Sequence, residues 1–141
     1  MEPARTLDPL PTWMVAPATR RVVDALSKGG AEVRFVGGGV RDALLGRPVA
    51  DIDIATPEPP ETVIDRLHSA DIHSIPTGIA HGTITAVIDG QHFEITTLRV
   101  DVETFGRHAE VAFTDDWTED AARRDFTMNA LSCRADGAVF D

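Results

Sequence analysis

Apolar residues recur at helical spacing in the first third of the chain and alternate with polar ones farther along it. Between residues 13 and 28, Val15, Val22 and Leu26 return at intervals that fit one helix, and two glycines end that segment. The same kind of pattern, together with helix-start signals, extends the prediction to further helices. The expected helices cover residues 13–28, 40–45, 61–70 and 118–124.

Short runs of β-branched and apolar residues predict a β-rich middle and end of the chain. Asp89 with Gly90, and Asp136 with Gly137, separate pairs of such runs and are typical of hairpin turns. The expected strands cover residues 33–36, 48–55, 73–76, 83–88, 92–99, 129–134 and 138–140. Residues 1–12 contain three prolines and are expected to form an irregular arm. The polar stretch 101–117 shows no clear period and is expected to be a long loop.

Composition then limits the class of protein. The 141 residues are enough for one domain, expected over residues 13–141 after the arm, and 43% of them are apolar, enough for a core. A net charge of −10 argues against a nonspecific nucleic-acid grip over the whole surface. No apolar run is long enough to cross a membrane, and prolines interrupt any signal-peptide pattern near the N-terminus. The single cysteine, Cys133, favours a reducing compartment, most simply the cytoplasm, and its apolar setting predicts a core position.

A glycine-rich turn is the first candidate for chemistry. Gly37, Gly38 and Gly39 follow a predicted strand and open a predicted helix, so their backbone N–H groups are suited to approach an anion. Arg41 lies in the first turn of that helix, where it suits a phosphate. The motif is neither a Walker loop nor the dinucleotide fingerprint, and an ordinary strand-to-helix turn is the alternative.

Asp51 and Asp53 are the second candidate. Residues two apart on a strand point to one face, so both carboxylates project together. Paired carboxylates repel unless a cation lies between them, and oxygen ligands of this kind suit Mg²⁺. A solvated strand end is the alternative for this pair taken alone. A phosphate-binding turn followed by a two-carboxylate strand nevertheless fits metal-dependent nucleotidyl transfer.

Two further sites remain open on the residues alone. Arg124, Asp125 and Asn129 are suited to binding a triphosphate and a ribose, although cations at a helix C-terminus are common. Glu94 lies in a predicted strand, where it is either a third acidic group of the site or an exposed surface residue.

Five segments, taken in order, make the sequence resemble the catalytic head of class II tRNA nucleotidyltransferases, the CCA-adding enzymes, and of bacterial poly(A) polymerases. Together they cover most of residues 33–140. The matching segments are 35–47, 51–56, 81–83, 93–99 and 123–131. The resemblance implies an α/β (α+β) nucleotidyltransferase head, in which a small mixed or antiparallel sheet is flanked by helices.

The resemblance also implies roles for single residues. Asp51 and Asp53 match catalytic, Mg²⁺-binding carboxylates, and Glu94 matches a further acidic position near them. The remaining matches concern the incoming nucleotide: Gly37 and Gly38 lie in the turn that binds it, Arg41 and Arg124 match triphosphate-binding arginines, and Asp125 and Asn129 lie in the motif associated with ribose recognition. The implied substrates are CTP, ATP and the 3′ end of tRNA.

Three functions are compatible with this resemblance. CCA addition or repair is favoured, because the residues from Gly46 to Thr56 resemble that branch more closely. A poly(A) polymerase head is the second, and a fragment that binds nucleoside triphosphate without efficient turnover is the third. The family chain continues into helical neck, body and tail regions that hold the base-selecting motif and most of the tRNA grip. This chain is therefore expected to be a head truncated before them.

Overall fold

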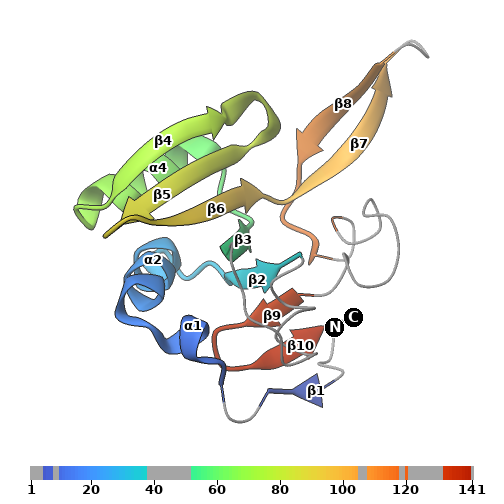
Figure 1. Cartoon of the computed structure of the whole chain (residues 1–141). Helices are drawn as coiled ribbons and strands as arrows, with labels where there is room; N and C mark the ends of the chain where they lie inside the picture. The colour runs from blue at the N-terminus through green and yellow to red at the C-terminus, as the bar shows by residue number, and fades with distance from the viewer. Residues whose placement is uncertain are drawn as a thin grey trace.

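The computed structural model describes residues 5–7, 10–37, 52–104, 108–117, 120 and 132–140. Eight of the described strands form one mixed sheet in the order β1-β10-β9-β2-β3-β6-β5-β4, and β7 and β8 pair separately (Figure 1). Within this described part, β3 and β6 pair in parallel and the other paired strands are antiparallel. The elements are β1 (Arg5–Thr6), α1 (Thr12–Val15), α2 (Pro17–Ser27), β2 (Arg34–Val36), β3 (Ile52–Thr56), α4 (Pro60–Ser69), β4 (His73–Gly78), η1 (Ile79–His81), β5 (Thr83–Ile88), β6 (Gln91–Thr97), β7 (Arg99–Thr104), β8 (His108–Phe113), β9 (Ser132–Arg134) and β10 (Ala138–Phe140).

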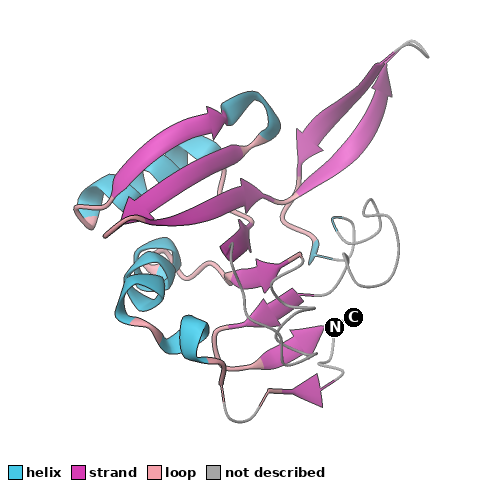
Figure 2. Cartoon of the chain, in the orientation of Figure 1, coloured by secondary structure: helices cyan, strands magenta, loops and turns pink. Residues whose placement is uncertain are grey.

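One face of the sheet forms the core. Ile54 of β3 lies beside Ile95 of β6, which lies beside Ile84 of β5, and none of the three has measurable exposure. Leu26 of α2 and Leu67 of α4 join them in a single apolar cluster. Figure 2 shows helices α2 and α4 along this side of the sheet. Each fully buried aliphatic side chain contributes about 1.5–3 kcal/mol to folding.

The opposite face carries polar side chains along the same strands. Because successive residues of a strand point to opposite faces, Asp53 turns away from the core that holds Ile52 and Ile54. Glu94 of β6 and Thr85 of β5 share its row across the sheet. This face therefore holds the residues from which the candidate site is built.

The predicted helices are confirmed in part. The helix expected over 61–70 is α4, which ends at Ser69 with Ala70 as its C-cap, and Val63 and Leu67 of this helix are buried. The single helix expected over 13–28 is wrong, because the chain breaks at Ala16 and α2 restarts with Pro17 in its first turn. The helix expected over 40–45 lies outside the described residues, as does all of 118–124 except Asp120.

The hairpin predictions are confirmed. β5 and β6 pair up to Ile88 and Gln91, and the two residues between them, Asp89 and Gly90, both have positive φ, 49° and 80°. Two left-handed residues in a two-residue turn match the twist of the flanking strands. The Asp136 and Gly137 turn likewise joins β9 to β10. The edge strand expected over 73–76 is β4, which continues to Gly78.

The long loop expected over 101–117 is wrong. Residues 99–104 and 108–113 form an antiparallel pair, β7 with β8, which extends away from the main sheet (Figure 1). Among the described strands, β7 and β8 pair only with each other. Their sequence lacks the clear apolar alternation that predicts a half-buried strand. Arg5 and Thr6, in the arm expected to be irregular, form β1 and pair with β10.

Candidate functional site

Two carboxylates meet on the polar face of the sheet. Asp53 of β3 and Glu94 of β6 lie directly beside each other in the parallel register of these strands. Asp53 is half-buried and Glu94 is exposed. Two like charges on neighbouring strands repel each other, and the energy is recovered when a cation or a donor lies between them. The strand pairing places Glu94 beside Asp53, and the role of Glu94 in the site stays a prediction.

Gly37 brings the turn after β2 against one of these carboxylates. Its φ of +75° lies in the left-handed region, which favours glycine. A Cβ added there would lie 3.1 Å from Oδ2 of Asp53. Any other residue at this position would therefore crowd the Asp53 carboxylate as well as strain the backbone. Gly37, the described residue of the glycine-rich turn, therefore lies beside the acidic strand.

A cavity of about 400 Å³ opens beside the two carboxylates. Thr77 of β4 and Thr85 of β5 share a hydrogen bond of 2.9 Å between their hydroxyls. His92 lies two residues before Glu94 on β6 and therefore on the same face. The full lining is Ile52, Asp53, Ile75, Thr77, Thr85, His92 and Glu94. The cavity thus offers hydroxyl and imidazole groups next to the carboxylates.

The donor set of this cavity fits a hard divalent cation. Carboxylate oxygens are the ligands that Mg²⁺ prefers, and it commonly keeps waters and substrate phosphates as its other ligands. Asp53 and Glu94 would supply two such ligands side by side. Among the described residues no group of three or more metal-ligating side chains occurs. The two carboxylates therefore fit a site that waters and phosphates complete.

The structure thus brings together Gly37, Asp53 and Glu94 of the predicted site residues. The others lie outside the described residues: Gly38, Arg41, Asp51, Arg124, Asp125 and Asn129. Thr77, Thr85 and His92 were missed by the sequence analysis. The spacing of His92 to Glu94 was a usable signal, whereas the two threonines are placed by strand pairing that the sequence does not reveal.

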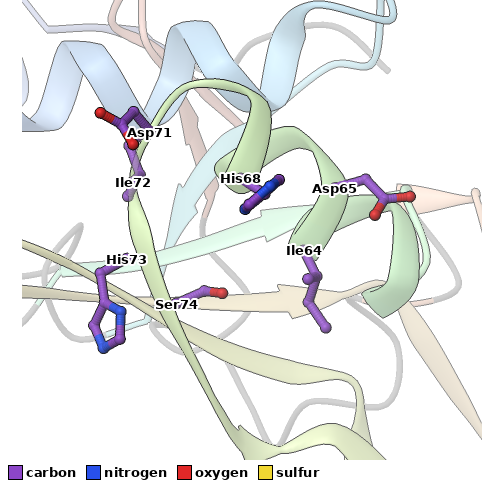
Figure 3. Close-up of a pocket in the computed structure, with 7 residues that line it drawn as sticks. All are labelled: Ile64, Asp65, His68, Asp71, Ile72, His73 and Ser74. Carbon is purple, nitrogen blue, oxygen red and sulfur yellow. The ribbon is translucent and has the colours of Figure 1, made fainter.

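A second and larger cavity, of about 510 Å³, lies on the helix side of β4 (Figure 3). Ser74 pairs with Ala86, which lies beside Phe93 of the core, whereas its neighbour Ile75 pairs with Thr85 near the carboxylates. The sheet therefore separates this cavity from Asp53 and Glu94. It is lined by Ile64, Asp65, His68, Asp71, Ile72, His73 and Ser74.

Cys133 has the core position that the sequence predicts. It is buried in β9 among the apolar residues of the main cluster. Burial raises the pKa of its thiol to about 11, and the carboxylate of Asp136 adds to that shift. A thiol in this state is a poor nucleophile, so Cys133 has no part in the site.

Most of the chain matches a known protein family. Residues 33–141 match the model of the poly A polymerase head domain. The chain belongs to this family. The match covers β2, β3 and β6, and therefore every described residue of the candidate site. In the part of the chain that the structure describes, no helix is long and apolar enough to span a bilayer.

Curated relatives of the head carry the names that the resemblance implies. The human protein named CCA tRNA nucleotidyltransferase 1, mitochondrial, is 47% identical over 123 residues, which are 86% of this chain and 28% of that protein. The CCA-adding enzyme of Bacillus cytotoxicus is 42% identical over 122 residues, 85% of this chain and 30% of that protein. The chain thus spans less than a third of the length of these relatives.

Solved structures agree with the sequence relatives. The Bacillus stearothermophilus CCA-adding enzyme in complex with CTP superposes with a TM-score of 0.73 at 36% identity, over 90% of this chain and 30% of that one. A tRNA nucleotidyltransferase complexed with a primer tRNA and an incoming ATP analog gives 0.61 at 26% identity, over 85% and 34% of the two chains. The α/β head with a mixed sheet and flanking helices is therefore the fold of this chain.

Proposed function

We propose that this chain is the catalytic head of a CCA-adding tRNA nucleotidyltransferase, which transfers CMP and AMP from CTP and ATP to the 3′ end of tRNA. The observation that carries the proposal is the Asp53 and Glu94 pair, set against Gly37 in a head of this family. Relatives named CCA-adding enzyme support the choice of reaction.

Asp53 and Glu94, together with Asp51, would hold Mg²⁺ at the edge of the cavity. The bound ion would lower the pKa of the attacking hydroxyl and offset charge on the phosphates. The backbone of Gly37 and Gly38 would receive the triphosphate by N–H donation. The cavity beside Glu94, which is lined by threonine hydroxyls, would leave room next to the carboxylates for the 3′ end of the tRNA.

Arginines and polar residues outside the described part would complete nucleotide binding. Arg41 and Arg124 would fix the triphosphate by charge-assisted hydrogen bonds, which are stronger than neutral ones. Asp125 and Asn129 would hold the ribose. These residues act by orientation, because in-line displacement at phosphorus depends mainly on alignment and charge. The compartment stays a prediction: the single buried cysteine favours a reducing one such as the cytoplasm.

The poly(A) polymerase alternative shares this head, and the family model carries its name. The two reactions differ in product. A CCA-adding enzyme stops after C, C and A on tRNA that lacks them, whereas a poly(A) polymerase extends RNA with ATP alone. The third possibility is a head that binds nucleotide without turnover. It predicts CTP and ATP binding in calorimetry with no product.

The test is nucleotide addition by the protein as its gene encodes it, with CCA-less tRNA, CTP, ATP and Mg²⁺. Asp53→Asn removes the negative charge at nearly constant size, so we expect kcat to fall about a thousandfold or more. Glu94→Gln should cause a smaller loss. Chelating Mg²⁺ should abolish activity while the near-ultraviolet circular dichroism is kept.

Asp65→Asn is the matched control, because Asp65 is exposed on α4, on the other side of the sheet. It makes the same chemical change and should leave kcat unaltered. Equal activity of Asp53→Asn and the unsubstituted protein would refute the proposed role of the carboxylates. Long poly(A) products on generic RNA would instead favour the polymerase.

A further inference from the structure

The strand register lines up the glycine turn, the carboxylates and the cavity beside them in one row across the polar face of the sheet. The row begins at the last residue of β2, which precedes Gly37, and continues through Asp53, Glu94, Thr85 and Ile75. The described residues that line the cavity come from β3, β4, β5 and β6. The cavity therefore extends from the carboxylates towards β4, away from the strand that carries the glycine turn.

A β-bulge in β4 brings a second hydroxyl to this row. The register of β4 and β5 shifts between Ile75 and Gly78, where residues 76 and 77 of β4 face residue 84 of β5. Thr77 lies in this bulge, and its hydroxyl oxygen is 2.9 Å from that of Thr85. Bulges next to active sites re-aim side chains. Here the bulge brings an exposed threonine of an edge strand into the lining of the cavity.

The two hydroxyls keep hydrogen-bonding capacity for a ligand. A threonine hydroxyl has one proton and two lone pairs, and the bond between Thr77 and Thr85 uses one of the two protons. The pair therefore offers one further donor together with acceptor sites. Thr85 is 5% exposed, so the strands fix its side chain, whereas Thr77 is exposed and accessible to a ligand in the cavity.

The cavity lining favours a hydroxyl group over a phosphate as the partner of this pair. Among the described residues that line the cavity none is lysine or arginine, and His92 stands against the carboxylates of Asp53 and Glu94. These carboxylates disfavour a second anion beside them. The 2′-hydroxyl of a ribose is both donor and acceptor, and it is the group by which a protein distinguishes RNA from DNA. It therefore matches what Thr77 and Thr85 offer.

We propose that Thr77 and Thr85 select RNA over DNA as the acceptor, by binding the 2′-hydroxyl of the 3′-terminal ribose beside Glu94. This inference rests on the proposed function, in which the 3′ end of the tRNA lies in this cavity. The 2′-hydroxyl is carried by the carbon next to the one that carries the attacking 3′-hydroxyl. Holding the 2′-hydroxyl therefore also orients the attacking group relative to the carboxylates, and such orientation contributes strongly to rate.

The experiment compares two acceptors, with the protein as its gene encodes it. One is tRNA that ends in C-C with an ordinary ribose at its 3′ terminus, and the other is the same tRNA with a 2′-deoxyribose there. AMP is added from ATP in the presence of Mg²⁺. We expect kcat/KM to be about tenfold higher on the ribose acceptor, the effect of one hydrogen bond made in the transition state.

Thr77→Val removes one hydroxyl at nearly constant shape. It should lower kcat/KM on the ribose acceptor about tenfold and leave the deoxyribose acceptor unchanged, so that the preference falls below about twofold. Thr77→Ser keeps the hydroxyl and should keep the preference. Because Thr77 is an exposed residue of an edge strand, both variants should fold.

Thr83→Val is the matched control. Thr83 of β5 and Thr96 of β6 form the same kind of hydroxyl pair, with 3.3 Å between their oxygens, and Thr83 lies two residues before Thr85. Both members of this second pair are described residues, and neither lines the cavity. The control therefore removes an equivalent hydroxyl from the same face of the same strand. It should keep the full preference for the ribose acceptor.

A second comparison, of ATP with dATP as the incoming nucleotide, identifies which ribose the hydroxyl pair binds. We expect Thr77→Val to leave the ratio of kcat/KM for ATP and dATP unchanged, because Gly37 follows β2, on the other side of the carboxylates. A change in this ratio at constant acceptor preference would assign the pair to the incoming nucleotide and overturn the inference.

Two other results would overturn the inference and leave the proposed function in place. One is nucleotide addition at equal rates on the ribose and deoxyribose acceptors. The other is a preference that Thr77→Val leaves intact, or that Thr83→Val reduces as much. An unsubstituted protein that adds no nucleotide to either acceptor would overturn the proposed function and this inference with it.

Discussion

Replacing Gly37 with alanine tests the contact between the glycine turn and Asp53 of β3. The backbone there has a φ of +75°, in which an alanine costs about 1–2 kcal/mol. Unfolding entropy of about 2.1 cal/mol/K per residue converts that cost into a melting temperature lower by about 3–7 °C. This loss of stability comes from backbone strain alone, and the same loss is expected at any other glycine of the chain that has a left-handed φ.

The additional effect at Gly37 comes from the carboxylate. The new Cβ would lie 3.1 Å from Oδ2 of Asp53, closer than ordinary van der Waals contact. Asp53 must therefore move by a few tenths of an ångström. A displacement of about 1 Å costs a hundredfold in rate, so this smaller one should lower kcat/KM about tenfold, or about 1.4 kcal/mol.

Gly30→Ala separates the two effects. Gly30 has a φ of +86°, and a Cβ added there meets nothing within 4 Å. Both variants should lose similar stability in thermal unfolding, while only Gly37→Ala should lose nucleotide addition. If Gly30→Ala loses as much kcat/KM as Gly37→Ala, or if neither loses any, the close approach to Asp53 does not govern the reaction.

Two further predictions concern other parts of the fold. The pKa of the Cys133 thiol is raised from 9.0 to about 11, so Cys133 should resist thiol reagents at pH 8 until the chain unfolds, and rapid labelling of the native protein would contradict its burial. The stability held by the protonated thiol is present below pH 9.0 and is lost as the pH rises through about 11. Gly82→Ala places a Cβ 2.7 Å from the Phe113 ring and should lower the free energy of unfolding. In a double-mutant cycle, Phe113→Ala should restore part of that lost stability. Strictly additive unfolding free energies would contradict the contact.

Local signals in the sequence were sufficient for the elements whose partners are close along the chain. The Asp89 and Gly90 turn specified its hairpin to the residue, because left-handed turn residues and the flanking alternation agree. Helix α4 was found because Val63 and Leu67 recur on one face. The prediction of one helix over 13–28 was wrong, because Pro17 begins a second helix, as a proline in the first helical turn commonly does.

Long-range pairing was beyond the reach of such signals. In the segment predicted as a loop, Val102 lies between the polar residues Asp101 and Glu103, but so short an alternation does not indicate which strand it pairs with. Glu94 is part of the predicted site by resemblance alone, and the parallel pairing of β3 with β6 places it beside Asp53. The contacts of Arg34 with Trp117 and Phe140 could not be predicted, because these aromatic residues lie far from Arg34 along the chain.

The parallel pairing of β3 with β6 also makes the geometry of the site depend on the correct strand register. Ile52 and Ile54 of β3 are buried, and Asp53 between them points to the other face. A slip of one residue would turn the carboxylate into the core and both isoleucines out of it. Burying an unpaired charge is costly, so misregistered pairings are penalised twice. If the proposed function holds, nucleotide addition would therefore depend on the fraction of molecules whose strands are in their native register.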